Sequence, residues 1–250
     1  MTQNLIDYTL HLADNTLILA QRNAEWCGHG PVLEQDIAIT NISLDLIGQA
    51  RNFYQYAAEM TGNGATEDSL AYLRKEREFK NCLLVEQPNG DWAQTILRQY
   101  FFSQYQYFLY QQLQQSKDAQ LAAIASKALK EVTYHLRWSS EWVIRLGDGT
   151  EESHQRMVRA IDELWRYTGE MFEAVSYELR AASEGIGVDV SKLKEEWMNK
   201  VQEIFSEATL IVPSKIFMQT GGKEGKHTEH LGYILTELQY MQRAYPKSEW

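Results

Sequence analysis

Cysteine and proline are scarce in this chain of 250 residues, which has two of the first and four of the second. Cys27 and Cys82 form no Cys-x-x-Cys motif, so we expect free thiols and neither a disulfide framework nor a zinc site. No run of 18 apolar residues occurs, which argues against a membrane-spanning helix. The N-terminal segment carries Asp7 and Asp14 and has no basic region before its apolar stretch. We therefore expect no secretory signal and a cytoplasmic protein.

Basic residues are in the minority, with 24 Lys and Arg against 34 Asp and Glu and a formal net charge of −10. This balance, without a long run of one sign, argues against a surface that binds nucleic acid through its phosphates. The apolar fraction is 44%, and a chain of this length can bury a large core without disulfides or metals. We expect one domain over residues 1–250.

Strand patterns are nearly absent, whereas long proline-free runs with apolar residues every three or four positions recur along the chain. This periodicity predicts an all-α protein. The helices are expected at about residues 4–26, 34–60, 67–80, 91–115, 118–146, 151–184, 191–207 and 228–244. Asp91 and Thr150 are predicted to cap two of them. The core of the bundle would span about 4–146, followed by the long helix 151–184 and by C-terminal helices within 191–245.

Two of these helices carry regular apolar seams, in which residues follow one another in steps of three and four. The first seam consists of Ile39, Ile42, Leu46, Gln49, Phe53, Tyr56 and Met60. The second consists of Leu121, Ala125, Ala128, Val132, His135, Ser139, Trp142 and Leu146. Such spacing keeps one stripe of a helix against its partner helices. Each seam has a polar residue near its middle, Gln49 in the first and His135 in the second.

These polar positions resemble the sites of metal ligands in ferritin-like di-iron bundles. There, two helices each supply a Glu, and two others each supply Glu-x-x-His, whose side chains lie on one face. Here the corresponding patterns are Leu46-x-x-Gln49 and Val132-x-x-His135. Two ferrous ions carry about four positive charges that anionic oxygen ligands must offset, and hydrocarbon cannot do this. A single buried histidine is more often a hydrogen-bonded core residue than a ligand.

The other two helices expected in such a bundle offer no carboxylate either. Residues 92–115 contain no Asp or Glu, and Ser103 stands at the middle of that helix. The inward stripe of the first helix is uncharged and consists of Leu5, Thr9, Leu12, Thr16, Leu19 and Asn23. We therefore expect no metal and no catalytic residue in this chain.

Four segments carry a close resemblance over the whole chain to a known family, the C subunits of bacterial phenylacetyl-CoA epoxidases (ring 1,2-epoxidases). They are Trp26-Cys27-Gly28-His29-Gly30-Pro31-Val32-Leu33-Glu34, Leu44-Asp45-Leu46-Ile47-Gly48-Gln49-Ala50-Arg51, Lys130-Glu131-Val132-Thr133-Tyr134-His135 and His227-Thr228-Glu229-His230-Leu231-Gly232. The resemblance implies a ferritin-like four-helix bundle with additional helices. It also implies that Leu46, Gln49, Val132 and His135 are vestigial ligand positions. Thr16 and Ser103 are matched to the remaining ligand positions by helical stepping alone.

The resemblance further implies a role in aerobic phenylacetate degradation. The chain would be a non-catalytic structural subunit that forms a heterodimer with the catalytic subunit of the epoxidase, its A component, and holds that subunit in its active form. The catalytic subunit would contain the di-iron centre and oxidise phenylacetyl-CoA. A reductase with flavin and an iron–sulfur cluster would supply electrons from NADPH, and the B component of the epoxidase would be a further partner.

The helix at 91–115 is rich in aromatic residues and has Arg98 as its only full charge after Asp91. Two interpretations are open. Its aromatic residues could contact a partner subunit, since aromatics with few charges are enriched at interface cores. A buried central helix explains the composition equally well. The residues expected at such an interface are Tyr100, Phe101, Tyr105 and Phe108.

A charged tract consists of Arg74, Lys75, Glu76, Arg77, Glu78, Phe79 and Lys80. Cations and an aromatic ring could bind the nucleotide part of coenzyme A, with Tyr177 and Arg180 completing the pocket. The chain could in that case be a coenzyme A-binding or regulatory module of the complex. The simpler interpretation of the tract is a solvated helix.

His227 and His230 have a spacing that could bind zinc, although packing at the start of a helix explains them more simply. The preceding glycine-rich residues 221–228 do not match the phosphate-binding loop pattern. A ferritin-like oxidase with non-standard ligands is the remaining alternative. Its ligands would be Asp45, Glu131, Glu141 or the two histidines, but Asp45 and Glu131 lie about 100° around the helix from the seams.

Overall fold

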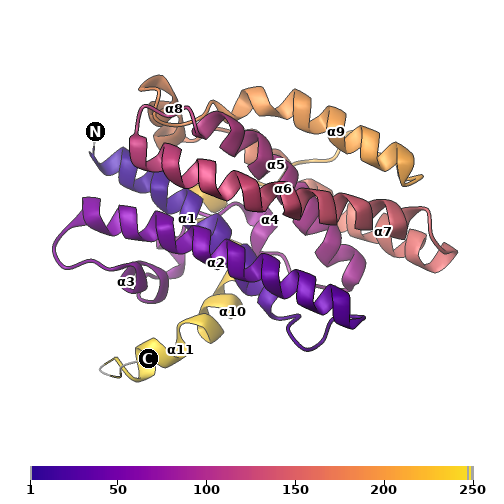
Figure 1. Ribbon diagram of the computed structural model, residues 1–250, viewed down its shortest axis with the longest axis horizontal. Helices are drawn as coiled ribbons and strands as arrows, with labels where there is room; N and C mark the ends of the chain where they lie inside the picture. The colour runs from indigo at the N-terminus through magenta and orange to yellow at the C-terminus, as the bar shows by residue number, and fades with distance from the viewer. Residues whose placement is uncertain (1, 247, 249–250) are drawn as a thin grey trace. The chain divides into compact units, whose positions relative to one another are not determined.

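The computed structural model describes residues 2–246 and residue 248. Within this part of the chain the regular structure is helical and no strand occurs (Figure 1), which confirms the predicted all-α class. No helix among the described residues is long and apolar enough to cross a membrane.

The chain divides into two compact units. The first unit contains the described residues up to Glu86 and those from Gly221 onward. The second unit contains Gln87–Thr220. That the chain is one domain over residues 1–250 stays a prediction.

In the first unit, two long helices pack along each other, α1 (Thr2–Ala24) and α2 (Leu33–Thr61). Glu34 and Asp36 lie in the first turn of α2, where carboxylates favour a helix N-terminus. Gly62 follows with a φ of 65°, which ends the helix at a conformation that glycine adopts readily. The shorter elements of this unit are α3 (Glu67–Tyr72), η1 (Glu76–Glu78), α4 (Leu83–Glu86), η5 (Gly222–Glu224), α10 (Glu229–Leu238) and α11 (Tyr240–Ala244).

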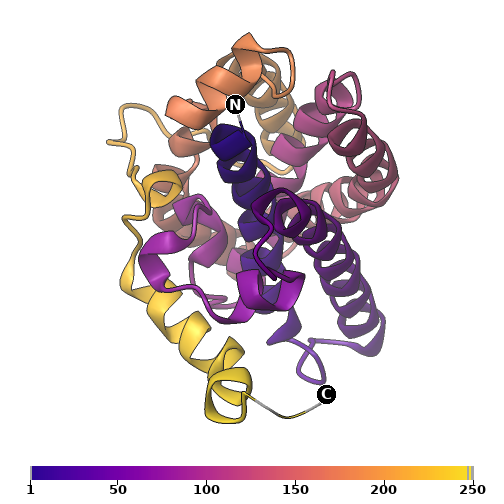
Figure 2. The same ribbon diagram turned by 90° about the vertical axis from the view of Figure 1, so that its left-hand side faces the viewer.

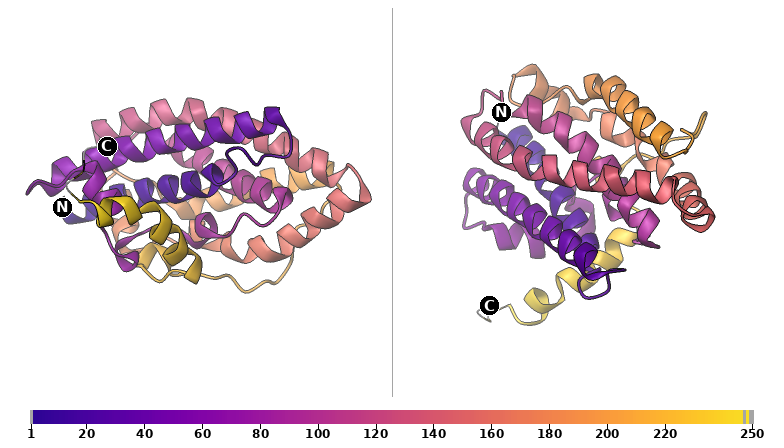
Figure 3. Two further views of the ribbon diagram at one scale, coloured as in Figure 1. Left: turned by 90° about the horizontal axis from the view of Figure 1, so that it is seen from below. Right: turned by 45° about the vertical axis from the view of Figure 1, so that its right-hand side comes forward.

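The second unit is also built on two long packed helices, α5 (Trp92–Leu113) and α6 (Ala119–Gly147), which lie side by side in Figures 1 and 3. The predicted caps are confirmed, because Asp91 accepts a hydrogen bond from the Gln94 amide and Thr150 accepts one from the Ser153 amide. The remaining elements are α7 (Glu151–Leu164), η2 (Trp165–Tyr167), η3 (Gly169–Phe172), α8 (Ser176–Ser183), η4 (Val190–Leu193) and α9 (Lys194–Glu207).

The predicted helix at 67–80 was wrong beyond its first turns. The helix α3 ends at Tyr72, and only the short turn η1 follows. The reason is a buried carboxylate on α1: Asp14 pairs with the Arg74 guanidinium and accepts a hydrogen bond of 2.7 Å from the Lys80 backbone amide. This amide is therefore held by a tertiary contact instead of a helical one.

The predicted helix at 151–184 was also wrong, because it is broken between α7 and α8. The intervening residues form two short 3-10 turns, η2 and η3. A Cβ on Gly169 would lie 2.6 Å from Cγ of Met218, so the close packing of Met218 depends on this glycine. The chain then turns into α8, where Glu178 accepts a hydrogen bond of 3.0 Å from the Val175 amide.

The aromatic side chains of α5 lie in the interior of the folded chain. Tyr100, Phe101, Tyr105 and Phe108 are all buried. The Phe101 ring packs against the rings of Trp165 and Trp197, each with a centroid separation of 5.6 Å. The four residues expected at a partner interface therefore form no exposed surface, and the interpretation as a buried helix is favoured.

Candidate functional site

The residues of the first unit that were predicted to be vestigial ligand positions are all buried. Leu46 and Gln49 lie on α2, and Thr16 lies on α1. The Thr16 hydroxyl donates to the backbone carbonyls of Leu12 and Ala13, at 3.1 and 2.9 Å. The Thr16 hydroxyl hydrogen is therefore bonded within α1. None of the side chains of Leu46, Gln49 and Thr16 is a carboxylate.

The corresponding positions of the second unit are also buried. Val132 and His135 lie on α6 and Ser103 lies on α5, and all three are fully inaccessible to solvent. Ser103 Oγ accepts a hydrogen bond of 2.7 Å from the side-chain amide of Gln99. Of these three residues, only His135 has a side chain that commonly binds iron.

The acids proposed as alternative ligands lie outside these buried positions. Asp45 and Glu131 are partly exposed, whereas Leu46 and Val132 beside them are fully buried. Glu141 is exposed and faces Arg145 at 3.7 Å. Among the residues that the structure describes, no three or more His, Cys, Asp or Glu side chains gather where they could hold a metal ion. The side chains at the predicted ligand positions thus lack the carboxylates that a di-iron centre needs.

A buried ion cluster lies in the first unit around Asp14. The Asp14 carboxylate accepts hydrogen bonds from the Tyr54 hydroxyl, at 2.6 Å, and from the Arg74 guanidinium. Arg74 also lies over the Phe79 ring, with its Cζ 4.2 Å from the ring centroid. Burial, and then the negative charge of Asp14, raise the pKa of Tyr54 well above its usual range. Tyr54 is therefore a hydrogen-bond donor at neutral pH.

The Asp14 cluster divides the charged tract at residues 74–80 into buried and exposed side chains. Arg74 and Phe79 are buried within the first unit, where Arg74 pairs with Asp14 and lies over the Phe79 ring, so neither side chain is exposed for a nucleotide. The residues between them, Lys75, Glu76, Arg77 and Glu78, are exposed. Tyr177 and Arg180 belong to the second unit, where Tyr177 is buried and Arg180 is exposed.

A cavity of about 620 Å³ lies beside the exposed part of the tract. Lys75 and Glu76 line one part of it, and α10 and α11 contribute Leu235, Tyr240 and Arg243. All of these residues belong to the first unit. The cavity thus offers cationic and aromatic side chains to a ligand, and it is the place where the coenzyme A hypothesis can be tested.

A second buried cluster in the first unit joins Glu86, at the end of α4, to the segment before α10. The imidazole of His227 lies between two acceptors, with Nδ1 2.9 Å from Glu86 Oε2 and Nε2 3.0 Å from the Phe79 carbonyl oxygen. The other carboxylate oxygen of Glu86 accepts from the backbone amide and the hydroxyl of Thr228, at 2.6 and 2.7 Å. Asn81 donates a further hydrogen bond to Oε2. Figure 2 shows the C-terminal segment, in yellow, beside this part of the chain.

The geometry of this second cluster indicates a charged imidazolium. Both ring nitrogens of His227 face oxygen acceptors, and a histidine can donate from both only when it is protonated. Burial lowers the pKa of His227, but the hydrogen bond and charge of Glu86 and the Phe79 carbonyl outweigh this effect, so that the pKa is raised. A zinc ion at His227 would have to displace one of these hydrogen bonds.

The clusters around Asp14 and Glu86 were not predicted from the sequence. A signal was present, because Asp14 lies within the largely apolar residues 10–19 and Glu86 directly follows the apolar residues 82–85. A carboxylate at such a position requires a buried partner. The partners Arg74 and His227 lie 60 and 141 residues further along the chain, and the sequence does not pair them.

These observations define a class: an all-α protein, consistent with a ferritin-like helical bundle, in which the buried residues Leu46, Val132, Thr16 and Ser103 are not carboxylates. The family described as "Phenylacetic acid catabolic protein" matches residues 1–250. The chain is 53% identical over 246 residues to a protein of Escherichia coli (strain K12) named as the C subunit of 1,2-phenylacetyl-CoA epoxidase, covering 98% of this chain and 99% of that relative. The chain therefore belongs to the phenylacetic acid catabolic protein family, as its sequence motifs indicate.

Proposed function

We propose that this chain is a non-catalytic structural subunit of a phenylacetyl-CoA epoxidase and that it stabilises the catalytic subunit, the A component of that enzyme. The observation that carries the proposal is the chemistry of the buried ligand positions. Leu46 and Val132, which take the places of two carboxylates, are fully inaccessible to solvent. The relative in E. coli is named as a subunit of such an epoxidase.

Electrostatics support this proposal. A di-iron centre brings about four positive charges into a dry interior, and the cost of burying them is offset only by anionic ligands. Leu46 and Val132 are hydrocarbon, and Gln49, Thr16 and Ser103 are neutral. The oxidation of the substrate therefore belongs to the catalytic subunit in this proposal.

The contribution of this chain is a rigid support. The first and second seams are buried along α2 and α6, apart from their C-terminal residues, which are partly exposed. Rigid elements that pack on a catalytic subunit can fix the helices that carry its ligands. The B component and a reductase that uses NADPH, flavin and an iron–sulfur cluster would complete a cytoplasmic enzyme.

Two measurements test the proposal: the iron content of each isolated chain, and the epoxidase activity of the chains alone and together. The isolated chain is loaded with Fe(II) under anaerobic conditions, desalted and assayed for iron, and the catalytic subunit is treated in parallel. We expect far less than one iron per chain here and about two per chain for the catalytic subunit. Epoxidase turnover, with reductase and phenylacetyl-CoA, should require both chains together. Two irons per chain in this protein, or full turnover by the catalytic subunit alone, would contradict the proposal.

A second candidate function, binding of coenzyme A, is favoured by the cavity beside Lys75 and Arg243. Titration of the isolated chain with coenzyme A tests it directly. Micromolar affinity that is lost in the Lys75→Ala variant, and kept in the Arg180→Ala variant of the second unit, would support this function. Binding that occurs only when the catalytic subunit is present would instead indicate a pocket shared between the two proteins.

A further inference from the structure

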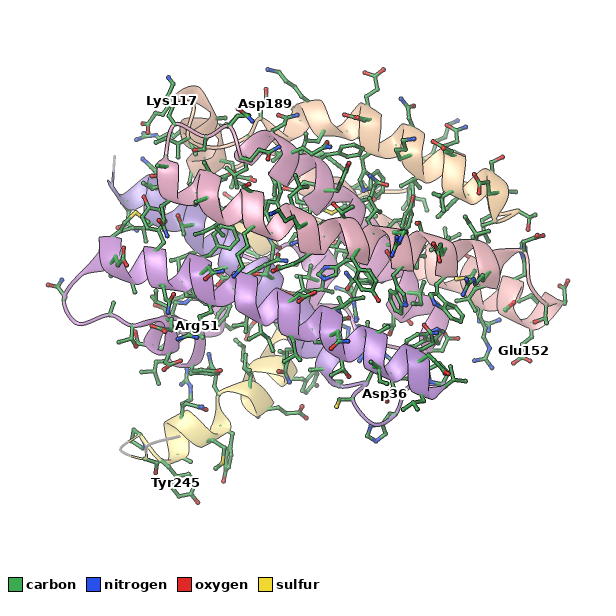
Figure 4. All side chains as sticks on the ribbon, viewed as in Figure 1. Asp36, Arg51, Lys117, Glu152, Asp189 and Tyr245 are labelled. Atoms are coloured by element: carbon green, nitrogen blue, oxygen red, sulfur yellow. The ribbon has the colours of Figure 1, made fainter. Side chains whose placement is uncertain are left out.

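Helix α2 carries a second apolar stripe, on the face opposite its buried seam. Four large apolar side chains of this outer stripe are exposed: Leu33 by 72%, Ile37 by 52%, Leu44 by 60% and Ile47 by 42%. They follow one another at intervals of four, seven and three residues, so that together with Gly48 they fall within about 100° around the helix axis. In Figure 4, the labelled residues Asp36 and Arg51 lie on α2, and every residue of the stripe except Leu33 falls between them in the sequence.

The regular spacing distinguishes this stripe from scattered surface residues. Single exposed apolar residues are common on soluble proteins. A row of them at heptad-like intervals on one long helix matches the pattern by which two helices pack. The buried seam of α2 already explains how this helix packs within the chain. The outer stripe has no such role, since its side chains reach solvent.

Gly48 is an independent observation on the same face. It lies inside α2 and is exposed, and a Cβ added to it would meet no atom within 4 Å. Glycine inside a helix is less favourable than alanine, and packing within this chain does not require it here. A glycine does, however, allow another backbone to come close. It stands directly beside Leu44 and Ile47, where a second helix would cross.

The charged residues around the outer stripe indicate the charge that a binding partner should carry. Glu34, Asp36 and Asp45 lie along this part of α2, and no Lys or Arg occurs between residues 23 and 50. The hydrogen bond from the Gly30 amide lowers the pKa of Asp36, which is thus an anion at neutral pH. Arg51, at the far end, faces Glu67 at 3.5 Å. Charge complementarity therefore requires basic side chains on the partner.

We propose that the outer stripe of α2 docks a helix of the catalytic epoxidase subunit, one that has an apolar stripe flanked by Lys or Arg. This inference rests on the proposed function, because it takes the catalytic subunit as the partner. A second copy of this chain, whose formal net charge is −10 over all its residues, would bring three further acids to the same face. It fits the surface less well than a basic helix does.

The test measures binding of the purified catalytic subunit to the full chain by titration calorimetry. Leu44→Lys places a cation in the middle of the stripe and should raise the dissociation constant by about 10-fold or more, the size typical of a residue at an interface centre. Leu179→Lys, on α8 of the second unit, is the matched control, because Leu179 is exposed by 58% and lies outside the stripe. It should change the dissociation constant by less than about 3-fold.

Two further variants guard against misfolding and test the charge argument. Gly48→Gln adds a side chain in open space, so the isolated chain should keep its helical circular dichroism while binding weakens. Glu34→Lys should weaken binding more at low salt than at high salt, since the lost attraction is screened by ions. Circular dichroism and thermal unfolding of each isolated variant establish that it folds.

The outcomes separate the two proposals. Absence of binding between the wild-type chain and the catalytic subunit would contradict the proposed function as well as the docking surface. Normal binding together with unchanged affinity of the Leu44→Lys and Gly48→Gln variants would overturn the docking surface alone. Self-association of the wild-type chain that the Leu44→Lys variant abolishes would show that a second copy covers the stripe, and would overturn the choice of partner.

Discussion

At the scale of single residues, the absence of carboxylates from the buried seams leads to a prediction about Val132. The Val132→Glu variant places a carboxyl group at a fully buried position without the three other acids that a di-iron site needs. We expect the free energy of unfolding to fall by about 2–4 kcal/mol, because an unpaired polar group is buried. Urea denaturation at pH 7 measures this change.

The neighbouring residue provides the control for Val132. Thr133→Glu adds the same group at an exposed position of α6 and should change the stability by no more than about 0.5 kcal/mol. A Val132→Glu variant as stable as Thr133→Glu would mean that the position has room or partners for a carboxyl group. The seam could then accept a charge, contrary to what its hydrocarbon lining indicates.

His227 predicts a pH dependence of stability. Its pKa is raised in the folded state above the usual value of 6.5. The stabilisation is therefore complete below pH 6.5 and is lost as the pH rises through the folded pKa. His227→Gln should remove this dependence and, at about pH 6, should lower the stability by about 2–3 kcal/mol, since buried Glu86 loses its cation.

Denaturation curves at several pH values from about 6 to 9 measure the effect of His227. The exposed His29 serves as the control, because His29→Gln removes a histidine that has no buried partner acid. Equal pH dependence in the wild type and in the His227→Gln variant would show that folding does not raise the pKa of His227, contrary to this prediction.

The sequence was sufficient to locate the buried seams but not the buried ions. Leu46, Gln49, Val132 and His135 were placed in the interior by helical spacing, and all are buried. Helical spacing is a local property, so it can be read along the chain. The pairing of Glu86 with His227 joins residues 141 positions apart. Such a contact depends on how the chain folds back, which local patterns do not contain.

At the scale of secondary-structure elements, two glycines in the long helices should respond in opposite ways to alanine. In Gly48→Ala the new methyl group meets open space, and the higher helix propensity of alanine should stabilise the chain by about 0.5–1 kcal/mol. In Gly147→Ala, at the end of α6, the new methyl group would clash with the backbone carbonyl of Ala208, so this variant should be less stable than the wild type. Thermal unfolding of both variants compares them directly. Destabilisation by Gly48→Ala would mean that α2 is more tightly covered at this position than the structure shows.

Two helices were predicted to be longer than they are, and they show why some helix ends cannot be predicted from the sequence. Residues 67–80 and 151–184 lack proline, and their apolar spacing continues without a strong break. In the structure, both segments make tertiary hydrogen bonds instead: the Lys80 amide donates to Asp14, and the Arg166 carbonyl accepts from the Gln219 amide at 2.8 Å. Tertiary contacts can override helix propensity, because the propensity of a single residue contributes only a small free energy. The long helices α2, α5 and α6 were predicted well, since their periodicity and the turn residues at their ends were present in the sequence.

At the scale of the whole molecule, the first unit is assembled from two separate parts of the chain. Its N-terminal part ends at Glu86, and its C-terminal part begins at Gly221. A Cβ at Gly222 would come within 3.1 Å of the backbone nitrogen of Leu83, so the two parts pack closely at this glycine. The carboxylate of Glu86 then joins them through His227 and Thr228. This carboxylate should therefore decide whether α10 stays attached to its unit.

The Glu86→Gln variant tests this attachment. Glutamine has one acceptor oxygen, whereas the carboxylate uses both of its oxygens to accept bonds from Thr228, His227 and Asn81. We expect a loss of about 2–3 kcal/mol in local stability, which lowers the hydrogen-exchange protection of α10 amides by about 30- to 150-fold. Exchange monitored by mass spectrometry measures this, with the exposed Glu229→Gln as control. Unchanged protection of α10 in Glu86→Gln would show that apolar packing of residues such as Leu231 and Ile234 holds the segment without the ion pair.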